Sequence, residues 1–168
     1  MFSLAAAQTF MTAEGIDAWL LYDYRGGNPL FWTLIGDSKA PTRRAFLIVP
    51  GRGEPVLLIH TIDQMFFIDV ALPKRVYRSW EEMRALVAAL LGAARRVAVD
   101  YSPDGAVPTA SFIDGGTLEW LRGGGYDLVP SADLFQASAT AWDDDAIASH
   151  QSASALVAAI KDGAFDLV

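Results

Sequence analysis

The chain has 168 residues, of which 52% are hydrophobic and 20% charged, and these values are typical of one globular domain with its own core. The formal net charge of −7 argues against a surface for nucleic acid or an anionic membrane, because both require a local excess of Lys and Arg. Because the sequence has no cysteine, it excludes disulfides, thiolate metal sites and thiol nucleophiles.

The apolar runs of the sequence are too short to cross a membrane, which requires roughly 20 residues. The first segment, MFSLAAAQTFMTAEG, lacks the basic residues that open a signal peptide. We therefore expect no membrane association and a cytoplasmic location. The basic pairs Arg43-Arg44, Lys74-Arg75 and Arg95-Arg96 each precede a strand-like run, and we interpret them as solvated strand ends.

The first elements are predicted by caps and by an abrupt change in hydrophobicity. Ser3 can cap a helix that Gly15 ends, and the apolar run 16–22 then predicts a buried strand. Turn-forming residues at 23–29 end that strand. The next run, 30–35, is rich in aromatic residues, so it either covers the sheet as part of the core or presents an aromatic surface to the outside.

Two nearly continuous apolar runs, 45–49 and 55–59, surround the turn segment 50–54 and predict a hairpin. Their high hydrophobicity indicates a sheet that is covered on both faces. The preceding segment, 37–42, is expected to be an exposed loop, and 63–71 is consistent with a short helix.

Strands and helices alternate through the next part of the chain: a strand at 76–77, a helix after 79, a strand at 95–101, a helix at 114–122 and a strand at 126–129. The second of these elements has a capping box, with Ser79 as the cap and Glu82 three residues later. This alternation, with one early hairpin, predicts a three-layer α/β/α domain with a mixed sheet of about five or six strands.

The last part of the chain contains a short apolar turn at 132–135 and then a long helix from Asp143 or Asp144 to Lys161. Three consecutive aspartates open this helix, and stabilisation of its positive end explains them better than a metal site does. Large apolar residues follow the helix. We interpret them either as the point at which a longer chain has been cut or as a surface that contacts a partner.

The sequence lacks the common motifs for nucleotide binding, nucleophilic catalysis and zinc binding, and neither of its two histidines, His60 and His150, has metal-ligand spacing. Both are expected to have structural or solvent-exposed roles. An alternative catalytic site is a magnesium centre formed by the strand-end aspartates Asp23, Asp63 and Asp100, because converging carboxylates could hold the ion. Their spacing is unspecific.

The best candidate for recognition is the loop from Tyr24 to Asn28, in which Arg25 and Asn28 flank two glycines at the end of a strand. Such a loop can offer the guanidinium group of Arg25 and backbone N–H donors to a carboxylate or to the end of a peptide. Trp32, just beyond it, is a further candidate for a substrate entrance or an interface. The alternative is an ordinary turn whose Arg25 is merely solvated.

Five segments appear in a characteristic order: GIDA at 15–18, the aromatic segment that closes at Gly36, the hairpin FLIVPGRGEPVLLI, the strand RVAVDYSP, and YDLVPSADLF before a long helix. Over nearly the whole chain this order resembles the amino-terminal domain of the creatinase, prolidase and aminopeptidase P family, the pita-bread metallopeptidases. The sequence departs from that family at 139–142, where an Arg-x-x-Lys-like basic stretch is commonly found.

The resemblance implies that 1–138 form a non-catalytic amino-terminal domain, and that 139–168 form a linker and the first helix of a catalytic domain. It implies an Xaa-Pro dipeptidase or aminopeptidase whose two divalent metal ions, Mn, Co or Zn, are held by the catalytic domain. None of the residues that bind these metal ions in the family can be assigned to this chain. We therefore name no catalytic residue and no metal ligand, and we expect this chain alone to be inactive.

The resemblance also implies the partners. They are the protein's own catalytic domain, a second copy in a homodimer, and a peptide substrate that enters near the loop from Tyr24 to Trp32. The amino-terminal domain would then make subunit contacts and wall one side of the active site. The alternative is a stand-alone binding or assembly module that has no peptidase half.

Overall fold

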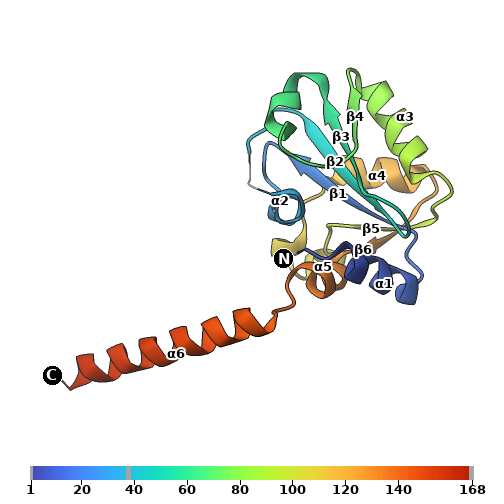
Figure 1. Cartoon of the computed structure of the whole chain (residues 1–168). Coiled ribbons are helices and arrows are strands. Elements are labelled where there is room, and N and C mark those ends of the chain that lie inside the picture. Colours follow the sequence, from blue (N-terminus) through green and yellow to red (C-terminus); the bar gives the residue numbers. More distant parts are fainter. Residues whose placement is uncertain (1, 37–38, 167–168) are drawn as a thin grey trace.

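A mixed six-stranded sheet lies between two layers of helices in the computed structural model, which describes residues 2–36 and 39–166 (Figure 1). The strands are β1 (Ala18–Tyr24), β2 (Arg44–Pro50), β3 (Val56–His60), β4 (Lys74–Tyr77), β5 (Arg96–Val99) and β6 (Asp127–Pro130). They are arranged in the order β4-β3-β2-β1-β5-β6. The predicted three-layer α/β/α architecture and the predicted mixed sheet are therefore confirmed.

The strand directions bring one set of chain ends together. β2 pairs antiparallel with β1 and β3, whereas the pairs β1–β5, β3–β4 and β5–β6 are parallel. Five of the six strands thus run the same way. Their carboxyl ends lie along one edge of the sheet, beside the start of β2, and this is the edge at which open α/β sheets commonly bind ligands.

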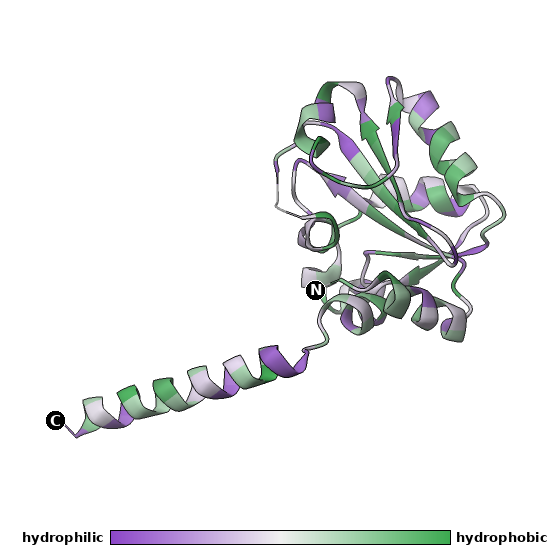
Figure 2. Cartoon of the chain, in the orientation of Figure 1, coloured by the Kyte–Doolittle hydropathy of each residue, from purple (hydrophilic) through white to green (hydrophobic). Residues whose placement is uncertain are grey.

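The helices divide between the two faces of the sheet. They are α1 (Leu4–Glu14), α2 (Pro29–Ile35), η1 (Thr61–Phe67), α3 (Trp80–Leu91), η2 (Pro103–Gly105), η3 (Pro108–Ala110), α4 (Gly115–Gly123), α5 (Ala132–Ala139) and α6 (Asp144–Phe165). α1, α2, α5 and η1 contribute to the core on one face, and α3 and α4 to the core on the other. Apolar residues dominate the central strands (Figure 2), as expected for strands covered on both sides.

Each face has its own buried cluster. Trp19, Leu21 and Leu47 lie on one face and pack with residues of α1, α2 and α5. The alternate positions of the same strands, such as Leu20 and Phe46, point to the other face and pack against α3 and α4. The aromatic run 30–35 belongs to the first cluster, because Phe31 and Trp32 are both buried there. Its interpretation as core is therefore confirmed.

The predicted helix caps are confirmed in detail. The Ser3 side chain accepts a hydrogen bond from the Ala6 amide, and Gly15 ends α1 in the left-handed conformation with φ 65°. In the capping box, Ser79 Oγ accepts from the Glu82 amide at 3.2 Å, while the Glu82 carboxylate accepts from the Arg78 amide at 2.7 Å. These contacts join only near neighbours in sequence, which is why the sequence predicts them.

Three element assignments differ from the sequence-based ones. β1 begins two residues later than predicted, because the Ile16 amide donates to the Met11 carbonyl and so completes the cap of α1. The short helix predicted at 63–71 is a 3-10 helix that spans Thr61–Phe67. The apolar turn predicted at 132–135 is the start of the helix α5 (Ala132–Ala139), whose Leu134 is buried in the same cluster as Trp19. Packing on the sheet extends that short segment into two turns of helix.

The last helix, α6, projects away from the sheet (Figure 1), and none of its described residues is buried. It continues to Phe165, four residues beyond the predicted end. Phe165 is 74% exposed, and the other two terminal apolar residues, Leu167 and Val168, lie outside the described residues, as do Asp37 and Ser38 of the predicted loop. Among the residues that are described, no helix is both long and apolar enough to cross a membrane.

Candidate functional site

The loop after β1 is held by the carboxylate of Asp23, which is fully buried. This carboxylate accepts hydrogen bonds from the Gly26 amide at 3.0 Å, the Asn28 amide at 2.9 Å and Trp32 Nε1 at 3.2 Å. Arg25 and Gly26 both adopt positive φ, 61° and 73°. The side chain of Asp23 thus folds the chain back over the strand end, in the way that Asx turns do.

Asn28 connects this loop to the core through both ends of its amide. Its Nδ2 donates to the Tyr22 carbonyl and to Asp100 Oδ2, each at 2.7 Å, and its Oδ1 caps α2 by accepting from the first amides of that helix. Because Asn28 is only 1% exposed, its hydrogen bonds are shielded from water. Its role is to position the loop.

Asp100, at the end of β5, is the buried centre of the same network. Its carboxylate accepts hydrogen bonds from Trp19 Nε1, Asn28 Nδ2 and the Ser131 hydroxyl. Burial raises the pKa of Asp100, and the hydrogen bonds from Ser131, Asn28 and Trp19 oppose this rise. The network joins the ends of β1, β5 and β6.

The structure separates the four candidate residues into two kinds. Tyr24 and Arg25 are exposed, and Tyr24 shows 49% of its surface. Asn28 and Trp32 are buried, and Trp32 stacks on Phe67 with their ring centres 5.6 Å apart. Only Tyr24 and Arg25 can therefore touch a ligand or a partner directly in this conformation.

The three strand-end aspartates do not converge. Asp23 and Asp100 share Asn28, but Asp63 accepts hydrogen bonds from the amides of Thr42 and Arg43, at 3.0 and 2.7 Å. Within residues 2–36 and 39–166, no three His, Asp or Glu side chains come together as a metal site. The alternative of a magnesium centre at these aspartates is therefore wrong, and this part of the chain does not fit a two-metal peptidase centre.

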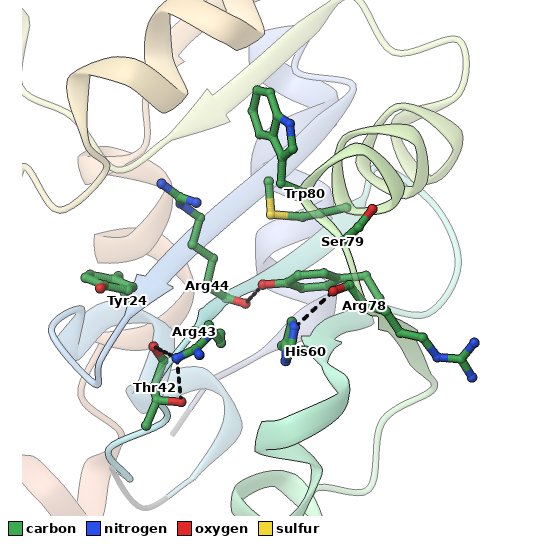
Figure 3. A pocket seen from close by; sticks show the side chains of 10 residues that line it. Tyr24, Thr42, Arg43, Arg44, His60, Arg78, Ser79 and Trp80 are labelled. Carbon is green, nitrogen blue, oxygen red and sulfur yellow. Dashed lines mark hydrogen bonds between the residues drawn. The ribbon is translucent and has the colours of Figure 1, made fainter.

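A cleft of about 360 Å³ opens at the carboxyl edge of the sheet, next to the candidate loop (Figure 3). It is lined by Tyr24, Thr42, Arg43, Arg44, His60, Tyr77, Arg78, Ser79, Trp80 and Met83. These residues come from the end of β1, the start of β2, the ends of β3 and β4, and the beginning of α3. The cleft thus exists because the sheet order places those four strands side by side.

The floor of the cleft is tied together by hydrogen bonds. The Tyr77 hydroxyl donates to the Arg44 carbonyl at 2.7 Å, and burial raises the pKa of Tyr77 to about 12. His60 Nδ1 accepts from the Ile62 amide, and His60 Nε2 faces the Arg78 carbonyl at 3.3 Å. Both ring nitrogens of His60 thus have backbone partners. The expected structural role of His60 is confirmed.

Sequence reasoning found Tyr24 but missed the arginines of this cleft. The pair Arg43-Arg44 does stand at the start of a strand, as interpreted, yet both residues line the cleft instead of merely ending the strand in solvent. The sequence gives little sign that these residues meet, because β3, η1 and β4 separate Arg44 from Trp80 along the chain.

No known protein-family model and no curated protein sequence matches the chain. Solved structures do match. A proline dipeptidase from Streptococcus pneumoniae is 20% identical with a TM-score of 0.60, over 81% of this chain and 96% of that one. The creatinase/prolidase N-terminal domain of an X-Pro dipeptidase from Streptococcus pyogenes is 16% identical with a TM-score of 0.60, over 79% and 95%.

The chain has the creatinase/prolidase amino-terminal-domain fold. The prolidase from Pyrococcus horikoshii matches 79% of it at 16% identity and a TM-score of 0.60, but the match covers only 33% of that prolidase. The chain thus spans about a third of the length of such prolidases.

Proposed function

We propose that this chain is the non-catalytic amino-terminal domain of an Xaa-Pro dipeptidase-like metallopeptidase. The observation that supports this most is the fold, since the structures of such domains from dipeptidases of Streptococcus pyogenes and Streptococcus thermophilus match over 95% and 97% of their own length. The metal centre and the peptide-cleaving residues would lie in a partner catalytic domain. The reading frame beyond codon 168 tests the proposal: we expect it to continue into a segment with metal-ligand spacing, and a stop codon there would contradict it.

The contribution of this domain would be to make subunit contacts in a homodimer and to wall one side of the active site. The exposed pair Tyr24 and Arg25 supports this role, because the buried carboxylate of Asp23 presents them on a fixed loop. Tyr and Arg are favoured where a surface must bury area and also direct hydrogen bonds. The loop would lie near the substrate entrance.

Kinetics of alanine variants in the full-length enzyme test this role. Arg25→Ala should raise KM or weaken dimerisation while the stability stays within about 0.5 kcal/mol, as is usual for a surface substitution. Trp32→Ala is the matched structural variant, and it should cost about 3–5 kcal/mol because a buried aromatic ring is removed. If Arg25→Ala changes neither KM nor the dimer equilibrium, the proposed role of the loop is wrong.

The alternative is a stand-alone binding or assembly module. The observation that favours it is α6, whose exposed apolar residues Ile147, Leu156, Val157 and Ile160 could serve as an interaction element. Sedimentation of the 168-residue chain discriminates between the two functions. Self-association through α6 in a chain with no catalytic half would favour the module.

A further inference from the structure

The cleft of Figure 3 has the features of a ligand site that acts without any catalytic domain. We propose that it binds a small organic carboxylate that carries one aromatic ring or a branched apolar group. This inference goes beyond the proposed function, because every lining residue belongs to this chain. It rests on the charge, the aromatic surface and the rigidity of the cleft.

The charge comes from Arg43 and Arg44, which are adjacent at the start of β2 and both line the cleft, although their side chains point in different directions (Figure 3). The one ion pair within residues 2–36 and 39–166 is Lys161–Asp162 on α6, so neither arginine pairs with a carboxylate of those residues. The guanidinium group has five N–H donors in a planar fork that matches a carboxylate. In a chain with net charge −7, this is a local excess of positive charge that faces a cavity.

Two described carboxylates near these arginines, Asp63 and Asp114, already have partners. Asp63 accepts from the amides of Thr42 and Arg43, and Asp114 caps α4 through Thr117. Asp114 is within electrostatic reach of Arg44 and offsets part of its charge. Arg43 is fixed differently, since its Nη1 donates to the Thr42 carbonyl and hydroxyl oxygens at 3.2 Å, which leaves its other donors for a ligand.

Not every cation of the cleft takes part. In Figure 3 the side chain of Arg78 points away from the other labelled residues, so its backbone lines the cleft while its guanidinium does not. The positive end of α3 is also offset, because Glu81 and Glu82 lie in its first turn. The cations that remain for a ligand carboxylate are Arg44, whose side chain enters the cleft in Figure 3, and Arg43 beside Thr42.

The organic part of the ligand is specified by two half-exposed aromatic rings. Tyr24 is 49% exposed and Trp80 52% exposed, and both line the cleft that Arg44 enters (Figure 3). Arg84 stacks on Trp80 with its guanidinium carbon 4.7 Å from the ring centre, which holds that ring in place. An inorganic anion would leave both rings in water, whereas a ring-bearing carboxylate would cover them.

The size and rigidity of the cleft limit the ligand to one ring or a comparable branched chain. Its volume of about 360 Å³ is at the small end of ligand pockets, which span roughly 300–1,000 Å³. Tyr77 and His60 hold its floor through hydrogen bonds to the backbone of Arg44, Ile62 and Arg78. A preformed site of this kind binds without a large ordering cost.

Titration of the ¹⁵N-labelled 168-residue chain with benzoate and with benzamide tests the proposal, because the two probes share their shape and differ in charge. Benzoate should shift the amides of Tyr24, Arg43, Arg44 and Trp80 in a saturable way. Benzamide should bind about tenfold more weakly, since hydrogen bonds to a charged group are stronger than those to a neutral one. Inorganic phosphate is the third probe and should bind more weakly than benzoate.

Charge-removing variants identify the binding groups. Arg43→Gln and Arg44→Gln should each weaken benzoate binding about tenfold. Arg75→Gln is the matched control, because Arg75 lies on the edge strand β4 and does not line the cleft. Circular dichroism verifies that the variants are folded.

Four outcomes would overturn the proposal: no saturable shifts with benzoate, equal binding of benzamide, equal or tighter binding of phosphate, or an equal loss in Arg75→Gln. Trp80→Leu gives an independent measure of the organic part. It should weaken benzoate more than phosphate, and an equal effect on both anions would exclude recognition of the ring.

Discussion

At the scale of single residues, the loop after β1 depends on a glycine and on a buried aspartate. Gly26 has φ 73°, and a β-carbon at this position would lie 2.2 Å from the Lys39 carbonyl oxygen. Asp23 holds the same turn through its carboxylate. The conformation of the loop is thus set both by backbone freedom and by a side chain beneath it.

Replacement of Gly26 by alanine should destabilise the domain by about 3 kcal/mol, from left-handed strain plus a clash with backbone. Gly53→Ala is the matched control, because Gly53 also has positive φ but has no atom within 4 Å of the added carbon. That variant should lose only about 1 kcal/mol. Urea unfolding measures both, and equal losses would show that the contact with Lys39 is absent in solution.

The pKa values of two aspartates should move in opposite directions. Burial raises the pKa of Asp100 above the usual 3.8, although Ser131, Asn28 and Trp19 oppose the shift. Hydrogen bonds from the amides of Arg96 and Arg95 lower that of the exposed Asp17 below 3.8. NMR titration of the carboxyl carbons should therefore find the midpoint of Asp100 above, and that of Asp17 below, the value of a free aspartate.

The same shifts predict how stability depends on pH. Because the folded state holds the Asp100 proton more tightly, the contribution of this group is fully present below pH 3.8 and is lost as the pH rises through its folded pKa. Asp17 contributes above pH 3.8, and its contribution is lost as the pH falls through its folded pKa. Unfolding free energies of Asp17→Asn and wild type, compared across this range, would refute the second statement if their difference did not shrink at low pH.

At the scale of elements, α5 and α6 show what packing adds to weak local signals. α5 buries Leu134 and Ser138, and the Ser138 carbonyl accepts a hydrogen bond from the Ser3 amide at 2.8 Å. α6 has a stronger local signal, with the Asp143 cap and aspartates in its first turn, but it buries nothing. A short helix is thus integral to the domain, whereas a long one is peripheral to it.

Removal of residues 144–168 should leave the melting temperature of the domain within about 1 °C, because no contact with the core is lost. Removal of 132–168 is the matched comparison, since it also deletes α5 and uncovers Trp19. That chain should fail to fold or should melt far lower. A large loss on removal of 144–168 alone would mean that α6 packs on the domain in solution.

At the scale of the whole molecule, the fold and the position of carboxylates together predict the absence of peptidase activity. The aspartates that could have formed a metal centre, Asp23, Asp63 and Asp100, are used instead to hold loops and strand ends. Purified chain 1–168, supplied with manganese or cobalt, should therefore not hydrolyse an Xaa-Pro dipeptide. Hydrolysis at the rate of a full-length prolidase would show that a catalytic centre had been overlooked.

The amino-acid sequence by itself determined the elements whose signals are local, and thereby the fold class. The caps at Ser3, Gly15 and Ser79, the hairpin, and the alternation of strands and helices all rest on contacts between residues a few positions apart. The three-layer sheet follows from that order because each apolar face must be covered. The aromatic run with Trp32 was assigned to the core for the same reason.

Only the tertiary structure decided which distant side chains meet. The order β4-β3-β2-β1 brings Tyr24, Arg44 and Trp80 to one cleft, and the pairing of β1 with β5 places Asn28 on Asp100. It also sends Asp63 to the loop before β2, away from the other aspartates. The physical reason is that strand order depends on how whole elements pack, so no local pattern in the chain records it.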